Sequence, residues 1–380
     1  MIDHYILVSV YCRFIIFVFK RYINRKKQLA WGVGLSHVPL RTGFQNFEQV
    51  EITLGDIKTP AIKASTNLIR IFDQSLSLFA HFPFSTTLRL EGGVAGTYRS
   101  FRWDEYNDYY VGNQFTGYQL VGSERNKIPT EDALQIDRYY TILKGTGANA
   151  NIALVGDNSY FGITSPLAGH RFRVSLEQYM GNDTYTGLLA DGRKYFWMRP
   201  FSFAFRGTSY FRWEKETNST YPLYIGNMGF VRGLGSILSS NVEDLGLTFS
   251  QLLGSKMMLG SFEIRLPFTG PKQLALIPSS FLLTDLNLFI DSGVAFDNFS
   301  DFREGKLIDY ILRDEDGNII LDPNGNPFYE VKNAKPTIVT SVGVSMRINL
   351  FGAMIIEPYY AMALMQGSKF RFGLNLIPGW

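Results

Sequence analysis

The sequence predicts an all-β protein, and more specifically an antiparallel transmembrane β-barrel. Three observations lead to this prediction: apolar side chains recur with a period of two, the alternating segments are long, and the connections between them alternate between short and long. Strands of soluble proteins average about 5–6 residues. The segments here run to roughly 10–15 residues, which is the length that a tilted strand needs to cross a membrane.

The composition agrees with a β-rich chain that is neither disordered nor a bundle of membrane helices. Of the 380 residues, 46% are hydrophobic, 19% are charged and 15% are aromatic, with 31 Phe, 21 Tyr and 36 Gly. Aromatic residues favour strands. The formal net charge of +3 gives no case for nucleic acid as a partner. The single cysteine, Cys12, excludes an internal disulfide and a Cys-based zinc site.

The period of two is clearest near the C-terminus. In the stretch SVGVSMRINL, Val342, Val344 and Met346 share one face, whereas polar residues and glycine share the other. The same alternation along the chain predicts about thirteen strands. They are expected near residues 5–22, 29–40, 66–82, 87–103, 149–158, 170–180, 184–197, 200–214, 256–268, 281–297, 337–350, 353–364 and 369–378.

The connections between these strands sort by parity. Every long connection follows an even-numbered strand in this order, and turns or shorter loops follow the odd-numbered ones. A soluble β-sandwich also has polar and apolar faces, but it has no reason to sort its loops. Long loops on one side are typical of a barrel in the bacterial outer membrane, with the long side outside the cell. The long connections are 41–65, 104–148, 215–255 and 298–336.

Aromatic residues cluster where strands are expected to end. Examples are HFPF (81–84), YFWM (195–198) and EPYY (357–360). Aromatic girdles at both membrane interfaces are a property of transmembrane barrels. We therefore expect outer-membrane lipid to surround the chain at the level between these clusters.

The start of the chain fits the barrel least well. Residues 5–19 are apolar except for Arg13, which is too short and too charged for a membrane helix. They also lack the basic region and cleavage site of a secretory signal. We expect an uncertain N-terminal segment at 1–12, a barrel domain at 13–380, and a true N-terminus that precedes this sequence.

Two acidic residues lie on the polar parity of neighbouring predicted strands. Glu263 and Asp291 would face a confined lumen, where they repel each other unless a cation joins them. The preceding long loop offers Arg232, which is flanked by Gly229, Gly233 and Gly235. Glycine allows a close backbone approach, and a guanidinium can bridge two carboxylates. Arg265 or Arg347 could supply the cation equally well.

Several motifs resemble the BamA/TamA-like outer-membrane surface-antigen superfamily. FVRGLG, GSFEIRLPF, LFIDSGVAFD, SVGVSMRINL and KFRFGLNLIPGW occur in the order found in that superfamily. Upstream, ALVGDNSYFGITSPLAGHRFRVSL and YTGLLADGRKYF are similar to the subgroup whose barrel follows a TolB-like propeller. The resemblance covers about residues 13–380.

The resemblance implies a 16-strand barrel whose sixth extracellular loop enters the lumen. The thirteen predicted strands would then be its fourth to sixteenth, and the first three strands and any periplasmic domain would be missing. The matching loop–lumen bridge comprises Arg232, Gly233, Glu263, Asp291 and Gly293. The resemblance further implies a role in inserting or translocating client outer-membrane or secreted proteins, or in anchoring a periplasmic module.

Other candidate sites have weaker signals. The histidines, His4, His37, His81 and His170, do not have metal-ligand spacing. No nucleophile elbow, phosphate loop or dinucleotide fingerprint occurs. The stretch 314–327 has the acidic start of a calcium loop, but Gly325 replaces its bidentate acid.

We therefore expect no enzymatic activity, no metal and no cofactor. The polar lumen also suits a different function, that of a passive diffusion pore. Planar-bilayer conductance separates the two functions, because a plugged barrel gives small or erratic currents and an open pore gives a large steady one.

Overall fold

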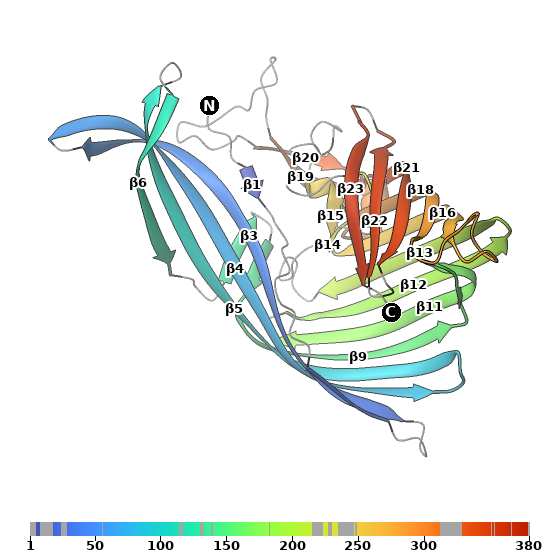
Figure 1. Cartoon of the computed structure of the whole chain (residues 1–380). Helices are drawn as coiled ribbons and strands as arrows, with labels where there is room; N and C mark the ends of the chain where they lie inside the picture. Colours follow the sequence, from blue (N-terminus) through green and yellow to red (C-terminus); the bar gives the residue numbers. More distant parts are fainter. Residues whose placement is uncertain are drawn as a thin grey trace.

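The computed structural model consists almost entirely of antiparallel strands, which form one large curved sheet (Figure 1). This confirms the predicted all-β fold. None of the helices in the described residues is long and apolar enough to cross a membrane. The structure describes residues 5–7, 18–23, 29–54, 56–113, 117–129, 133–137, 140–181, 183–214, 223–226, 230–234, 247, 249–311, 329–350, 352, 354–365 and 367–378.

Each main strand of the sheet pairs with the main strands that precede and follow it in the sequence, so these strands form a continuous meander. Among the described residues, β23 pairs with β22 alone, so β23 lies at one end of the sheet. The successive strands are β2 (Val18–Ile23), β3 (Ala30–Leu54), β4 (Ile57–Pro83), β5 (Leu88–Asn113), β9 (Gly145–Asp157), β11 (Pro166–Gly181), β12 (Tyr185–Met198), β13 (Phe201–Glu214), β16 (Lys256–Gly270), β18 (Leu283–Phe296), β21 (Val339–Leu350), β22 (Met354–Ala363) and β23 (Arg371–Pro378).

Short elements lie along or beside this meander. β1 pairs with β3, and β6 pairs with the distal half of β5. Others form small hairpins or extend the ends of long strands. The full set of short elements is β1 (Tyr5–Leu7), β6 (Gly117–Ile128), β7 (Ala133–Asp137), β8 (Tyr140–Leu143), β10 (Tyr160–Phe161), β14 (Leu223–Tyr224), η2 (Phe249–Leu252), β15 (Leu253–Gly254), β17 (Ile277–Pro278), α1 (Asp301–Glu304), β19 (Lys306–Ile311) and β20 (Tyr329–Ala334).

The sequence predicted the order of the long strands but not their full length. β3, β4 and β5 contain 25, 27 and 26 residues, so the predicted loops 41–65 and 104–148 are largely strand, and that part of the prediction was wrong. The extensions pair with one another along their whole length, which satisfies their backbone groups. With β6 they form a projection away from the other strands (Figure 1).

The two faces of the sheet have inverted polarity compared with a soluble protein. On the convex face, large apolar side chains such as Leu76, Val94, Leu288, Val344 and Phe372 are exposed. On the concave face, polar side chains are buried instead. They include Ser202, Asn287, Asp291, Ser341, Ser345, Glu357 and Asn375.

The predicted aromatic girdles are present only in part, because alternate residues of each cluster face opposite sides. Phe82, Phe196 and Tyr360 are exposed on the convex face, whereas Tyr195 is buried on the concave face. Tyr359 also points inward, where its ring contacts Phe289 edge to face. The clusters therefore supply both the outer apolar surface and inner packing.

The N-terminal predictions and the calcium-like stretch fall mainly outside the described residues. Of the segment 1–12, only β1 is described, and it pairs with residues 43–45 of β3. The stretch 314–327 lies entirely outside them.

Candidate functional site

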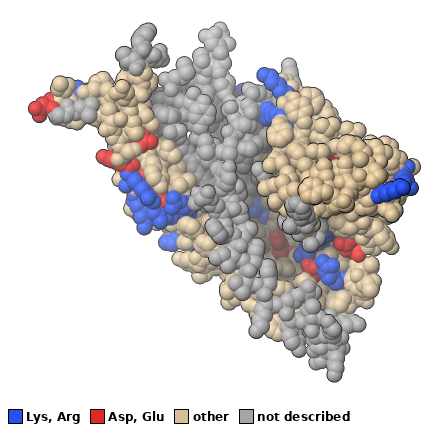
Figure 2. Space-filling view, in the orientation of Figure 1, with Lys and Arg blue, Asp and Glu red and all other residues tan. Residues whose placement is uncertain are grey.

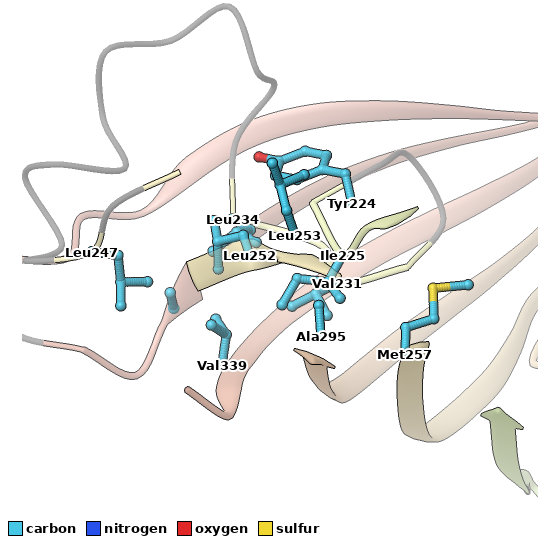
Figure 3. Packing of buried hydrophobic residues seen from close by; sticks show 11 residues of the cluster. Tyr224, Ile225, Val231, Leu234, Leu247, Leu252, Leu253, Met257, Ala295 and Val339 are labelled. Atoms are coloured by element: carbon cyan, nitrogen blue, oxygen red, sulfur yellow. The ribbon is translucent and has the colours of Figure 1, made fainter. Parts of the chain in front are cut away.

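A segment of the long connection 215–255 lies on the concave side of the sheet. Its residues Val231, Arg232 and Leu234 are buried, and Val231 and Leu234 belong to an apolar cluster with side chains from the sheet. Figure 3 shows Val231 close to Ala295 of β18, and Leu234 beside Leu252 of η2. Apolar packing therefore fixes Val231 and Leu234, which lie on either side of Arg232, and the Arg232 guanidinium must find its partners on the strands of the sheet.

Arg232 is held by Asp291 through side chain and backbone together. Its Nε lies 2.7 Å from Asp291 Oδ2, and its Nη2 lies 2.9 Å from Asp291 Oδ1, which is a bidentate pair. The Arg232 backbone N–H also donates to Asp291 Oδ2 at 3.2 Å. Ser261 of the adjacent strand β16 donates to Asp291 Oδ1 at 2.7 Å, which fixes the carboxylate.

The same guanidinium reaches two further acids. Arg232 Nη2 lies 2.8 Å from Glu263 Oε1, and Arg232 Nη1 lies 3.0 Å from Glu357 Oε1. These acids stand on β16 and β22, and Asp291 stands on β18. One loop residue therefore connects three strands of the wall, with only 6% of its side chain exposed.

Two other arginines complete the network. Arg265 Nη2 lies 2.7 Å from Glu263 Oε2, and Arg347 Nη2 lies 2.9 Å from Glu263 Oε1. Arg347 Nη2 also lies 3.1 Å from Glu357 Oε1. The alternatives left open by the sequence are thus all present, because each of the three arginines contacts Glu263. Three cations face three acids, so the buried group has no net charge. Buried ions need this pairing.

The ring of Phe289 lies beneath the guanidinium. The Arg232 Cζ atom is 3.5 Å from the centre of the Phe289 ring, which is a close cation–π contact. Phe289 is buried on β18, two residues before Asp291. The ring therefore covers one of the two faces of the guanidinium, which carboxylates in its plane leave open.

Two glycines allow the loop to approach the wall. Gly233 has φ +83°, and a Cβ there would lie 2.8 Å from Ala361 Cβ of β22. A Cβ on Gly293 would lie 2.8 Å from Val231 Cγ2 and 2.9 Å from Leu259 Cδ2. Both positions of the predicted bridge therefore lack space for a side chain. Gly229 and Gly235 lie outside the described residues.

Glu357 is the site residue that the sequence reasoning missed. It lies in EPYY, which was interpreted only as an aromatic girdle. Its carboxylate also accepts from Ser345 Oγ at 2.9 Å and from Asn375 Nδ2 at 3.2 Å. The alternation of β22 could have identified Glu357, because it places this acid on the same buried face as Ile355 and Ala361. A buried carboxylate needs a charged or hydrogen-bonding partner.

A second segment covers the concave side near the short turns. Ser165 Oγ donates to Asp285 Oδ2 at 3.0 Å, and Thr164 donates to the same oxygen. Asn349 Nδ2 donates to the carbonyl of Ile163 at 3.0 Å. Arg265 Nη1 donates to the Pro166 carbonyl at 3.1 Å, which links this segment to the arginine–acid network.

The chemistry of the site is that of an ion-pair clamp. Each acid of the network has at least one guanidinium within 3.1 Å. No group of three or more His, Cys, Asp or Glu residues in the described part of the chain is arranged to hold a metal ion. The arrangement binds one part of the chain to another, and its role in holding the connection 215–255 stays a prediction.

Comparison of the sequence with protein-family models gives no match, and comparison with curated proteins gives none. Solved structures with a similar arrangement include BamA from Haemophilus ducreyi lacking POTRA domains 1–3, with a TM-score of 0.41, 10% identity, and coverage of 97% of this chain and 75% of that one. CdiB from Acinetobacter baumannii has a TM-score of 0.35, 10% identity, and coverage of 97% and 66%. A bacterial polysaccharide outer membrane secretin has a TM-score of 0.31, 8% identity, and coverage of 94% and 100%.

Proposed function

We propose that this chain forms the wall of an outer-membrane β-barrel of the surface-antigen type and acts without enzymatic chemistry. Its role would be to insert or translocate client outer-membrane or secreted proteins, or to anchor a periplasmic module. The motifs that resemble the superfamily motivate the specific role. The physical case for the membrane comes from the polarity of the sheet.

The inverted polarity is the observation that carries the proposal. Full exposure of a Leu or Phe side chain to water costs about 1.5–3 kcal/mol relative to burial, and Leu76, Leu288 and Phe372 are each more than half exposed. Lipid tails remove this cost, whereas water does not. The buried concave side, with Glu263, Asp291 and Glu357, is the polar interior that a membrane barrel encloses.

The ion-pair clamp favours a plugged barrel over an open pore. A diffusion pore needs a continuous aqueous path, but Arg232 and its loop occupy the concave side at the level of β16, β18 and β22. The segment 163–166 fills the same side nearer the short turns. With the Arg232 loop and the segment 163–166 inside it, the barrel has no open aqueous path and serves as a scaffold.

The experiment is reconstitution of the purified chain into lipid vesicles and then into planar bilayers. We expect a heat-modifiable band in gels, β-rich circular dichroism, and small or erratic currents. Arg232→Ala should increase both the frequency and the size of openings. A chain that stays soluble without detergent contradicts the membrane assignment, and a large steady conductance of one size supports the pore instead.

The client role needs its own test. β23 pairs with β22 alone among the described strands, so its other edge offers unpaired backbone groups to an incoming strand. A photo-crosslinker at exposed Leu374, on this last strand, should capture nascent outer-membrane chains in cells. The matched position is exposed Val174 in the middle of the sheet, which should capture none.

A further inference from the structure

The convex face carries a group of basic residues directly beyond its apolar band. On β4 and β5 the even-numbered residues face outward, as the exposure of Leu76, Leu78 and Val94 shows. The pairing of the two strands continues without a register shift from Pro83 to Ile62. Arg70 and Arg102 are therefore cross-strand partners on this same outward face.

The position of these arginines along the strand can be compared with the thickness of a membrane. The outward side chains of β4 from Phe82, next to the short turn, to Phe72 are apolar except for Gln74. Ten residues at about 3.3 Å each span roughly 33 Å. A strand tilt of about 40° reduces this to roughly 25 Å along the membrane normal, which is the height of the apolar band in outer-membrane barrels. Arg70 follows two residues later, at the headgroup level of the outer side.

A buried carboxylate organises the basic group. Asp104 on β5 is only 1% exposed, and three guanidiniums surround it. Its Oδ2 lies 3.1 Å from Arg70 Nη1 and 2.9 Å from Arg102 Nε, and its Oδ1 lies 3.1 Å from Arg125 Nη2 on β6. One carboxylate neutralises one of these three charges. Among the described residues no other acid pairs with these arginines, so the other two charges remain and the cluster is cationic.

The free sides of the guanidiniums point to solvent. Arg102 and Arg125 are 43% and 51% exposed, although both are held at Asp104. Lys127, the cross-strand partner of Asp104, adds another exposed cation to the same face. Asp108, further along this face, receives a hydrogen bond from Ser123 instead. Figure 2 shows basic side chains gathered over the region of β5 and β6, with acidic side chains further out.

We propose that the phosphate headgroup of an outer-leaflet lipid binds the cluster formed by Arg70, Arg102, Arg125 and Lys127, which we call the outer basic cluster. This inference rests on the proposed membrane function. Arginine matches the oxygens of phosphate with paired N–H donors. Asp104 holds the guanidiniums in place before binding, so little side-chain entropy remains to be lost. The neighbouring apolar band accommodates the acyl chains of the same lipid.

The test uses native mass spectrometry of the full chain in neutral detergent, with lipid A, a doubly phosphorylated glycolipid, as the probe. The unmodified chain should retain lipid A, and Arg102→Gln with Arg125→Gln should lower its affinity about thirtyfold. The matched control is Lys58→Gln with Arg303→Gln, which removes two charges from exposed positions elsewhere. That control should bind lipid A as the unmodified chain does.

Further measurements distinguish a lipid phosphate from free phosphate, and the lipid site from the proposed membrane function. Dephosphorylated lipid A should bind no better to the unmodified chain than to the double variant, and about 10 mM inorganic phosphate should not displace lipid A, because it lacks acyl chains. Displacement by inorganic phosphate, or equal binding of lipid A to both variants, overturns the lipid site. A heat-modifiable, inserted chain that binds no lipid A refutes this inference alone, whereas a chain that does not insert refutes the membrane function. If the double variant loses heat-modifiability, Arg125→Gln alone is measured instead.

Discussion

Arg232 and Asp291, 59 residues apart in the chain, are joined by three hydrogen bonds, two from the guanidinium and one from the backbone N–H. The backbone contact means that Asp291 fixes the position of the loop main chain as well as the side chain. If the Arg232 side chain changed rotamer, the hydrogen bond from its backbone N–H to Asp291 would still hold the loop main chain.

Arg232→Ala should lower the free energy of unfolding by about 3–5 kcal/mol, because it leaves Asp291, Glu263 and Glu357 with an uncompensated buried charge. Urea unfolding in lipid vesicles measures this loss, and limited proteolysis measures release of the loop 215–255. Arg303→Ala is the control, since that side chain is 83% exposed. Unchanged protease resistance in Arg232→Ala would contradict the clamp.

A double-mutant cycle should show that Arg232 and Asp291 act together. Asp291→Asn leaves an excess buried cation, just as Arg232→Gln leaves an excess anion. The double variant restores the balance of charge, so its cost should be smaller than the sum of the single costs by about 1–3 kcal/mol. The same urea titration measures the free energy of unfolding of the unmodified chain, the two single variants and the double variant. Additive costs would mean that the pair is not coupled.

Gly293→Ala should destabilise the loop–wall contact by about 1–3 kcal/mol, because the new Cβ meets Val231 on the loop and Leu259 on β16. Gly260→Ala on the adjacent strand is the matched control, since nothing lies within 4 Å of its Cβ position. Heat-modified gel mobility against temperature compares the two. Equal melting of both variants would show that the loop does not press on β18.

Gly233→Ala tests close approach separately from backbone strain. Gly233 and Gly352 have φ +83° and +76°, so alanine is strained at both positions. Only at Gly233 would the Cβ meet a neighbour, Ala361, at 2.8 Å. Gly233→Ala should therefore cost at least about 1 kcal/mol more than Gly352→Ala in the same unfolding assay. A similar cost for both would assign the whole effect to strain.

The sequence predicted strands correctly where one face of the strand is apolar along its whole length. The alternation in 337–350 and 369–378 predicts β21 and β23 because every second residue there is apolar. It failed at 41–65 and 104–148, where strands extend past the apolar band and lose the regular alternation. Pairing between neighbouring strands, which a single segment does not reveal, determines the structure there.

Residues of the site could be predicted from the sequence where a clear alternation assigns them to the polar face of a strand. Glu263 and Asp291 were proposed in this way, and the glycines around Arg232 predicted a close approach. Glu357 was missed because the aromatic residues around it suggested an interface position. The sharing of Glu263 by three arginines depends on side chains from β16, β21 and the loop meeting in space, and no local pattern encodes that.

The three acids that share Arg232 stand on different strands, and this has a consequence for the alignment of the sheet. Sliding any one of these strands by a single residue would turn its acid from the concave to the convex face. Such a slip would break a contact with Arg232 and expose a carboxylate outside. The guanidinium thus works as a register lock, which allows one alignment of β16, β18 and β22 and penalises every neighbouring one.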